Sequence, residues 1–239
     1  MTGTALKFLM AFLMVLDHIG MFVSPHLAAI LHFITRPVAP VFAYLAMEGY
    51  IHTKDRKKYL LRLYISAAIM FIGSYLINNF IISNPEFYIH NNIFFTLALG
   101  VTALLIYEKI QLNYSKFLGL LMLTTIIVIA MYFAEGGVFI VPFMLIAFVM
   151  KDKPKVRNTL FITLSIIMIP SVWQDLGNFN DSLDLFFQNS DILMFAMAIP
   201  FLYLYNGKRG KNTTFTKYFF YVFYPLHLWI INILADKIL

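Results

Sequence analysis

Cysteine is absent from this chain of 239 residues, and charged residues are scarce at 13%. The absence of cysteine excludes disulfides, thiolate nucleophiles and cysteine-ligated metals. The scarcity of charge, with 61% hydrophobic residues and a mean hydropathy of +0.78, leaves no room for a sizeable soluble domain. Long apolar stretches recur to the end of the sequence, which is typical of a polytopic helical membrane protein. We therefore expect an all-α transmembrane bundle that forms a single domain over residues 1–239.

The apolar stretches divide the chain into about nine expected spans. These are residues 6–24, 28–51, 60–82, 91–108, 117–134, 137–150, 158–174, 191–206 and 217–236. The span at 137–150 is short, because about 20 residues normally cross the hydrocarbon core. The segments at 117–134 and 137–150 therefore form either two crossings or a re-entrant hairpin around Glu135.

Basic residues lie almost entirely on one side of this arrangement. The loops HTKDRKK, EKIQLNYSK, KDKPKVRN and NGKRGKNTTFTK alternate with loops that contain no Lys or Arg, and 16 of the 18 basic residues fall on one side. The positive-inside rule places that side in the cytoplasm, with the N-terminus inside and the C-terminus outside. The location of these charges favours the lipid bilayer as the partner and argues against nucleic acid. Asp17 and His18 interrupt the first apolar run, so we expect a retained span rather than a signal peptide.

Four ionisable residues from three of the expected spans lie at similar depths in the membrane. At ~1.5 Å of rise per residue, Asp17 and His18 lie roughly 16–18 Å above the cytoplasmic start of the first span. Arg36 lies roughly 12 Å below the outer edge of the second span, and His227 roughly 15 Å up the last one. Charged groups in a membrane usually face a bundle interior or an aqueous cavity. We expect these four residues to meet in one layer.

Proline residues interrupt the helices beside these charges. Pro37 follows Arg36 directly, and Pro225 precedes His227 by two residues, so both helices lose backbone hydrogen bonds there. Irregular helices at membrane depth are tolerated where they line a cavity or are buried in protein. The alternative is structural: Asp17 and Arg36 form a buried ion pair, and each histidine is a satisfied hydrogen-bonding residue.

A second cluster lies at the cytoplasmic end of the second span and the start of the third. Basic, hydroxyl and aromatic side chains of this kind can hold an anionic head group or a phosphorylated cofactor. For the lysines the alternative is ordinary orientation charge, which polytopic proteins need. The members are Tyr50, Thr53, Lys54, Arg56, Lys58, Tyr59 and Arg62.

The chain resembles the TraX family, named for the conjugative pilin acetylase. The segments that carry the resemblance are ALKFLMAFLMVLDHIG, RPVAPVFAYLAMEGYIHTKDRKKYLLRL, NNIFFTLALG and YFFYVFYPLHL, which run from residue 5 to residue 228 with gaps. The resemblance implies an integral-membrane acyltransferase of the bacterial cytoplasmic membrane that takes acetyl groups from acetyl-CoA. Residues 110–200 match only as generic spans, so the acceptor, whether a protein N-terminus or a cell-surface glycan or lipid, does not follow.

The residues and the resemblance fit one scheme. The basic cluster binds the phosphates of acetyl-CoA, and the thioester reaches the layer of ionisable residues. His18 acts as general base, oriented by a neighbouring carboxylate, which can be Asp17 only through water or a nearby helix because Asp17 lies ~100° round the helix from His18. Arg36 or His227 stabilises the oxyanion. Direct transfer and an acetyl-histidine intermediate both fit, and we expect no metal. The alternatives are a small proton-coupled transporter or exporter, with the four residues as a proton relay, and a non-catalytic scaffold.

Overall fold

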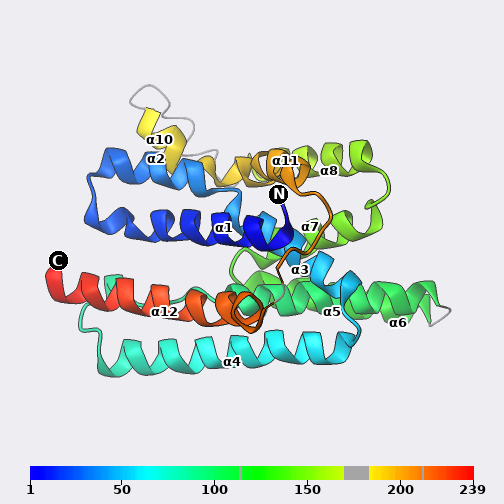
Figure 1. Cartoon of the computed structure of the whole chain (residues 1–239), viewed down its shortest axis with the longest axis horizontal. Helices are drawn as coiled ribbons and strands as arrows, with labels where there is room; N and C mark the ends of the chain where they lie inside the picture. Colours follow the sequence, from blue (N-terminus) through cyan, green and yellow to red (C-terminus); the bar gives the residue numbers. More distant parts are fainter. Residues whose placement is uncertain (113–114, 170–182, 212) are drawn as a thin grey trace. The chain divides into compact units, whose positions relative to one another are not determined.

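The structure is a computed structural model that describes residues 1–112, 115–169, 183–211 and 213–239. All regular structure in these residues is helical, with no strand, which confirms the predicted all-α class. The α-helices are α1 Gly3–His18, α2 Pro25–Thr35, α3 Val38–His52, α4 Arg56–Phe80, α5 Ile93–Gln111, α6 Lys116–Phe133, α7 Gly137–Val149, α8 Pro154–Ile167, α10 Leu183–Gln188, α11 Met194–Leu204 and α12 Thr214–Ile238 (Figure 1). Short 3₁₀ helices are η1 Ile19–Phe22, η2 Pro85–Phe87 and η4 Ser190–Leu193.

Hydroxyl and amide side chains set where several of these helices begin. Each accepts a hydrogen bond from a backbone N–H of the first turn, which would otherwise have no partner. At α12 the cap is reciprocal, because the Thr216 side chain also accepts from the Thr213 N–H. The capping residues are Thr2, Ser24, Asn92, Ser115 and Thr213.

Six helical segments of the described residues are long and apolar enough to cross a membrane: 3–22, 25–52, 56–80, 93–111, 116–133 and 214–238. Two shorter apolar helices cover 137–149 and 190–204. The predicted span at 158–174 coincides with α8 only as far as Ile167, and its residues 170–174 lie outside the described part of the chain. The helices make the chain a membrane protein, whereas the count of nine spans and the orientation stay predictions.

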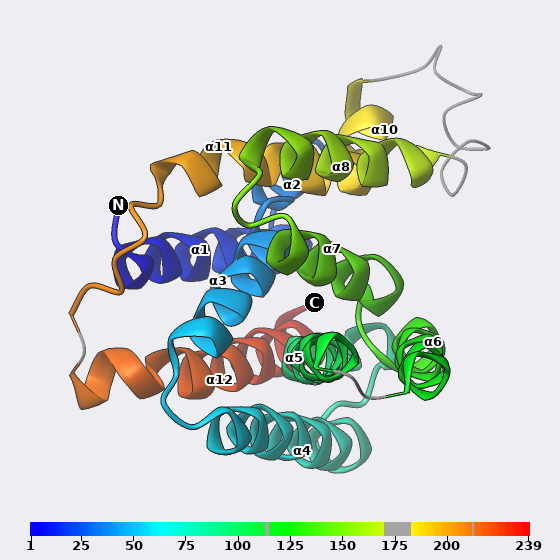
Figure 2. The same ribbon diagram turned by 90° about the vertical axis from the view of Figure 1, so that its right-hand side faces the viewer.

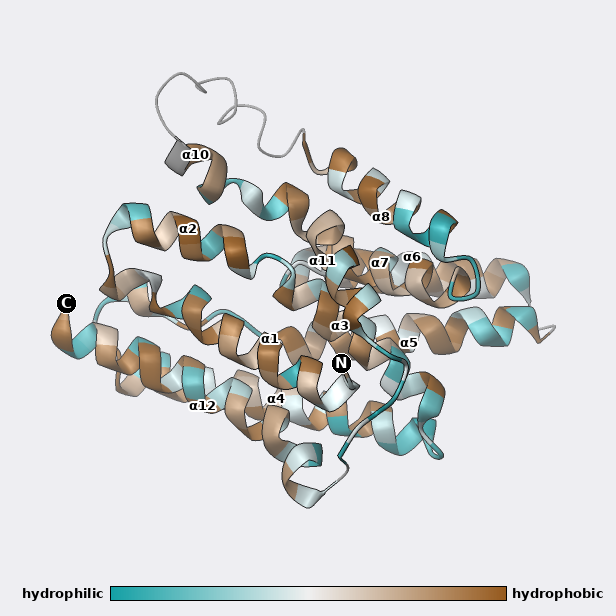
Figure 3. Ribbon diagram, turned by 45° about the horizontal axis from the view of Figure 1, so that its top comes forward, coloured by the Kyte–Doolittle hydropathy of each residue, from teal (hydrophilic) through white to brown (hydrophobic). Residues whose placement is uncertain are grey.

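Exposed apolar side chains cover the long helices. Phe117 and Phe133, at the two ends of α6, are 80% and 76% exposed. Figure 3 shows hydrophobic residues following one another along most of the helices. Because water-soluble proteins rarely expose large continuous apolar surfaces, lipid is the natural neighbour of these side chains.

The second predicted span is broken where proline was expected to break it. Arg36 and Pro37 form a turn between α2 and α3, and the helix resumes at Val38. Pro37 has no N–H to donate, while its carbonyl accepts from the Val41 N–H of the new helix at 3.0 Å. The kink at Arg36 is therefore confirmed.

The chain divides into two compact units. Unit 1 comprises Met1–Phe42, Ser74–Ile89 and Phe161–Leu239, and unit 2 comprises Ala43–Gly73 and His90–Leu160. In unit 1, α1 lies against α2 and α12, and α2 lies against α10 (Figure 1). The prediction of one domain over 1–239 stays a prediction.

Unit 2 is centred on α5, α6 and α7, which pack against one another (Figure 2). Its core includes a cluster of buried residues, Leu99, Ala103, Ala130 and Val141. Small residues allow the helices to approach closely, as is common between membrane helices. A Cβ atom at Gly137, for example, would lie 2.6 Å from the backbone oxygen of Ala130.

Candidate functional site

Two histidines predicted to converge lie beside each other in unit 1. His18 is the last residue of α1, and His227 lies at the middle of α12. Their ring centroids are 5.2 Å apart, with the ring planes at 89°. His227 is 7% exposed, and its ring stacks on that of Phe223 with a centroid distance of 5.1 Å. The structure thus brings together two imidazoles from helices that are far apart in sequence.

Both rings make the same hydrogen bond to their own helix. Nδ1 of His18 lies 2.7 Å from the carbonyl oxygen of Met14, and Nδ1 of His227 lies 3.0 Å from that of Phe223. A carbonyl oxygen can only accept, so Nδ1 carries the hydrogen in each ring. In a neutral imidazole the other nitrogen, Nε2, then has a free lone pair. Nε2 of His227 is buried and has no hydrogen-bond partner among the described residues.

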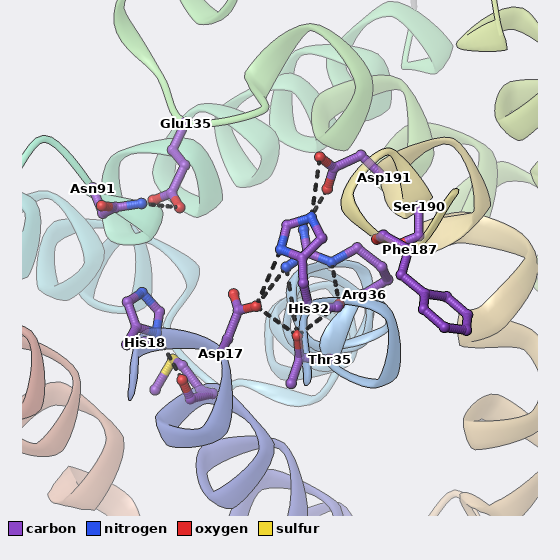
Figure 4. A network of polar contacts seen from close by, with 11 residues as sticks. Asp17, His18, His32, Thr35, Arg36, Asn91, Glu135, Phe187, Ser190 and Asp191 are labelled. Carbon is purple, nitrogen blue, oxygen red and sulfur yellow. Dashed lines mark hydrogen bonds and ion pairs between the residues drawn. The ribbon is translucent and has the colours of Figure 1, made fainter. Parts of the chain in front are cut away.

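Asp17 and Arg36 form the centre of a charged cluster next to this pair, also within unit 1. Arg36 Nη2 donates to Asp17 Oδ1 at 2.7 Å, and Arg36 Nη1 donates to Asp191 Oδ1. Arg36 Nε donates to the His32 carbonyl oxygen at 2.7 Å, and Thr35 Oγ1 donates to Asp17 Oδ1 at 2.6 Å. Figure 4 shows these side chains turned toward one another. Every guanidinium nitrogen of Arg36 is therefore engaged by the protein.

The His32 imidazole closes this cluster into a ring. Its Nδ1 lies 3.5 Å from Asp17 Oδ1, and its Nε2 lies 3.7 Å from Asp191 Oδ2 (Figure 4). Two carboxylates are thus bridged twice, once by the guanidinium and once by the imidazole. Exposure rises along the cluster, from 13% for the Arg36 side chain to 48% for that of Asp191. The contacts of this cluster hold Asp17 in place. The cluster extends from Asp17 and Arg36 to Asp191, whose side chain is more exposed.

Three members of this cluster were not predicted as site residues. His32 and Thr35 precede Arg36 by four and one residues, and the spacing of four was a usable signal because it puts His32 on the same helix face. Asp191 belongs to η4, and nothing in the sequence connects it with Arg36 across 155 positions. In unit 2, Asn92 caps α5, and Asn91 donates to Glu135 at 2.7 Å (Figure 4).

The second predicted cluster lies wholly in unit 2, and its aromatic and arginine members gather around an unpredicted carboxylate. Tyr50 is fully buried, and its hydroxyl donates to Glu108 Oε2 at 2.5 Å. Arg56 Nη1 donates to the same oxygen at 2.6 Å, and its guanidinium carbon lies 4.6 Å from the Tyr50 ring centroid. Glu108 therefore neutralises Arg56 and orders the end of α3 against α5.

Tyr59 and Arg62 form the next layer of this cluster, in the first two turns of α4. The Tyr59 hydroxyl donates to the Ala46 carbonyl oxygen at 3.0 Å, and Arg62 lies 5.9 Å from the Tyr59 ring centroid. Nε of Arg62 is buried and has no hydrogen-bond partner among the described residues. This N–H therefore keeps a hydrogen that no acceptor among the described residues receives.

The remaining members, Thr53, Lys54 and Lys58, lie in and after the loop between α3 and α4. Lys54 is exposed, Thr53 is half-buried, and the Lys58 side chain is 82% exposed. Asp55 caps α4, and because the Lys58 N–H donates to its carboxylate, the pKa of Asp55 lies below its ordinary value. No group of three or more residues that could hold a metal ion occurs in the part of the chain that the structure describes.

Comparison with known proteins agrees with the resemblance. The sequence is 25% identical over 202 residues to a protein of Dichelobacter nodosus described as "Probable fimbrial assembly protein FimC, serogroup H1", covering 83% of this chain and 80% of the relative. No solved structure matches the chain. A family model described as "TraX protein" matches residues 2–235. The chain therefore belongs to the TraX family.

Proposed function

We propose that this protein is an integral-membrane acyltransferase that moves an acetyl group from acetyl-CoA to an acceptor. The observation that carries the proposal is the His18–His227 pair, in which both Nδ1 atoms are held by backbone carbonyls. Each neutral ring then offers Nε2 as a proton acceptor. General base catalysis requires a positioned lone pair of this kind, and histidine supplies it near neutral pH.

Acetyl-CoA would supply a thioester whose carbonyl carbon is attacked by the acceptor. His18 Nε2 takes the proton of the attacking amine or hydroxyl, and the imidazolium returns it to the sulfur as the carbon–sulfur bond breaks. Protons and electrons balance, and the products are the acetylated acceptor and CoA thiol. The Nδ1–H bond to Met14 keeps the imidazole in one tautomer during this cycle.

The hydrogen bonds suggest other roles for Arg36 and His227 than oxyanion stabilisation. Arg36 has all three nitrogens engaged, so it acts by holding Asp17, with His32 and Asp191 completing the cluster. Neutral His227 has no hydrogen on Nε2 to offer an oxyanion, and we assign it to accepting a hydrogen bond from the nucleophile. The charge of the Asp17 carboxylate, fixed beside His18 in sequence, favours the imidazolium that forms during transfer.

The phosphates of the donor would be held in unit 2, where Arg62 has an unpartnered buried Nε atom. Lys54 and Lys58, which are exposed, add positive charge, and Thr53 adds a hydroxyl. Tyr50, Tyr59 and Arg56 are already bonded within the protein, so we assign them to shaping this surface. Acetyl-CoA is cytoplasmic, which agrees with the orientation proposed from the basic loops.

We further propose nine crossings of the bacterial cytoplasmic membrane, with the N-terminus inside and the C-terminus outside. The charge asymmetry of the loops supports this orientation. The acceptor is a protein N-terminus or a cell-surface glycan or lipid. The D. nodosus relative is described as a fimbrial assembly protein, which favours a fimbrial or pilin-like subunit as the acceptor.

The experiment is transfer of radiolabelled acetyl from acetyl-CoA into membranes that contain His18→Ala or wild-type protein. We expect the substitution to lower transfer by at least about 100-fold, the usual share of a general base. His26→Ala, an exposed histidine in the first turn of α2, is the matched control and keeps wild-type activity. Wild-type transfer by inserted His18→Ala protein contradicts the assignment.

A binding measurement separates this function from transport. CoA or acetyl-CoA should raise the thermal unfolding temperature of the detergent-solubilised protein, and Arg62→Gln should reduce that rise. Indifference to CoA, together with pH-dependent stabilisation by a small solute, would favour the transporter instead.

A further inference from the structure

The segment 205–211, which connects α11 to α12, carries the most concentrated exposed positive charge of unit 1. Its sequence, Tyr-Asn-Gly-Lys-Arg-Gly-Lys, has three basic residues and no carboxylate. Lys208, Arg209 and Lys211 are all exposed. No ion pair to a carboxylate involves these three side chains within the described residues. Their charge is therefore available to a partner outside the chain.

Backbone hydrogen bonds fix this segment to the start of α1. The Gly3 N–H donates to the Lys208 carbonyl oxygen at 2.8 Å, and the Thr4 N–H donates to that of Arg209 at 2.9 Å. The Thr4 hydroxyl donates to the carbonyl oxygens of Arg209 at 2.8 Å and Lys211 at 3.1 Å. Because these carbonyls accept hydrogen bonds from α1, the backbone of the segment is fixed, while its basic side chains remain exposed.

Two glycines allow this path. Gly207 has φ of 72° and Gly210 has φ of 85°, in the left-handed region that other residues rarely adopt. The segment thus turns tightly twice and presents its charges from a fixed backbone rather than from a free loop. Less conformational entropy is lost when a partner binds to a surface that is already ordered.

Further features at this end of unit 1 point to a lipid partner. α1 begins at Gly3 and α12 at Thr214, and the positive end of a helix dipole lies at each N-terminus. Large apolar or aromatic side chains nearby are open to the surroundings: Tyr203 is 67% exposed and Phe215 65% exposed. Exposed Tyr residues beside basic residues at the ends of membrane helices are typical of the head-group region.

We infer that residues 208–211, with Lys217 in the first turn of α12, form a binding surface for anionic phospholipid head groups. Lys217 is exposed, and its Nζ lies 5.0 Å from the Tyr218 ring centroid. Phosphate oxygens take the place of the missing carboxylates, and the exposed aromatic rings lie among the glycerol and upper acyl groups. The inference is independent of the transfer reaction, because no residue of the proposed transfer or donor sites takes part.

The test compares lipid binding by wild-type protein and by a triple variant, Lys208→Gln/Arg209→Gln/Lys211→Gln. Detergent-solubilised protein is titrated with a fluorescent phosphatidylglycerol, and in parallel with the phosphatidylcholine of the same chains. We expect roughly fivefold weaker phosphatidylglycerol binding for each charge removed, so about 100-fold for the triple variant. Added salt should weaken wild-type binding, and phosphatidylcholine binding should not change.

The matched control is Lys151→Gln/Lys153→Gln/Lys155→Gln, which removes the same charge from another basic loop, where Asp152 lies among the lysines. Equal losses in the two triple variants would show a general charge effect and overturn the inference. Unchanged phosphatidylglycerol binding in the 208–211 variant would overturn it as well. Inorganic phosphate could also compete with phosphatidylglycerol for the 208–211 surface at concentrations that do not affect the 151–155 loop. That result would identify a free-phosphate site instead of a lipid site, and would also overturn the inference.

Discussion

A helical histidine can bond its Nδ1–H to the carbonyl four residues earlier, and His18 and His227 both do so. The bond fixes the tautomer and the ring at once, and it leaves Nε2 as the reactive atom. Asp17 is fixed differently, by Thr35, Arg36 and His32 together. At the scale of single residues, the site therefore consists of two imidazoles, each fixed by a backbone carbonyl, and the Asp17 carboxylate, which three neighbouring side chains fix.

Arg36 is the residue whose loss should cost most stability in that ring. Arg36→Met leaves the charge of Asp17 without its guanidinium partner, and we expect a loss of about 3 kcal/mol, the scale of breaking a largely buried ion pair. Asp191→Asn removes a carboxylate that is nearly half exposed, so its cost should stay below about 1 kcal/mol. Thermal unfolding of the two purified variants in one detergent measures the difference. Equal stability of the two variants would contradict the central place of Arg36.

Depth along the helices was enough to indicate which ionisable residues lie near one another, whereas their roles stay predictions. The rise per residue placed Asp17, His18, Arg36 and His227 in one layer, and the structure brings Asp17 to Arg36 and His18 to His227. The depth of a residue along its helix does not show which distant residue it contacts, so the contact of Asp191 with Arg36 was not predicted. Glu108 was missed for the same reason, because its contacts with Tyr50 and Arg56 join positions more than fifty residues apart.

At the scale of helices, proline and glycine decide where elements break and how closely they approach. Pro37 separates α2 from α3, and the break puts Arg36 in the turn between them. Apolar run lengths predicted most of the helices, because a helix in lipid must satisfy its own backbone. The packing of α5, α6 and α7 could not be predicted, since runs of uniformly apolar residues carry no sign of which side faces protein.

Gly137 is the sharpest test of that packing. A Cβ atom there would meet the Ala130 backbone oxygen at 2.6 Å and the Ala130 Cβ at 2.8 Å, and backbone atoms cannot rotate away. Gly137→Ala should therefore destabilise the α6–α7 pair by about 1–3 kcal/mol. Gly20→Ala is the control, because the nearest atom to its Cβ lies at 3.5 Å, an ordinary contact. Thermal unfolding of the two variants measures the difference in stability. Identical unfolding temperatures would argue against the close approach of α6 and α7 at Gly137.

At the scale of the whole molecule, the distribution of basic residues predicts one orientation. The wild-type chain has no cysteine, so single introduced thiols report accessibility without any background. Lys153→Cys and Lys208→Cys should react with an impermeant maleimide only after the membrane is opened, because both lie on the basic side. Glu86→Cys, in η2, should react in intact cells. Labelling in the opposite pattern would invert the proposed orientation.

Fold class and membrane character followed from composition, because few charges and repeated apolar runs leave no other stable arrangement. The division into two units did not follow. Each unit is assembled from segments that are separate in sequence, such as Ser74–Ile89 with Phe161–Leu239. No composition change marks a boundary of that kind, so the sequence reads as one uninterrupted domain.

The shared Nδ1 bonds of His18 and His227 also govern how the two rings can be modified chemically. An electrophile that reaches either imidazole meets only the Nε2 lone pair, because Nδ1 faces its own helix. Acylation or alkylation of the folded protein should give a single regioisomer at each ring, substituted on the nitrogen distant from the main chain. Unfolding would release both nitrogens and produce the mixed isomers of free histidine.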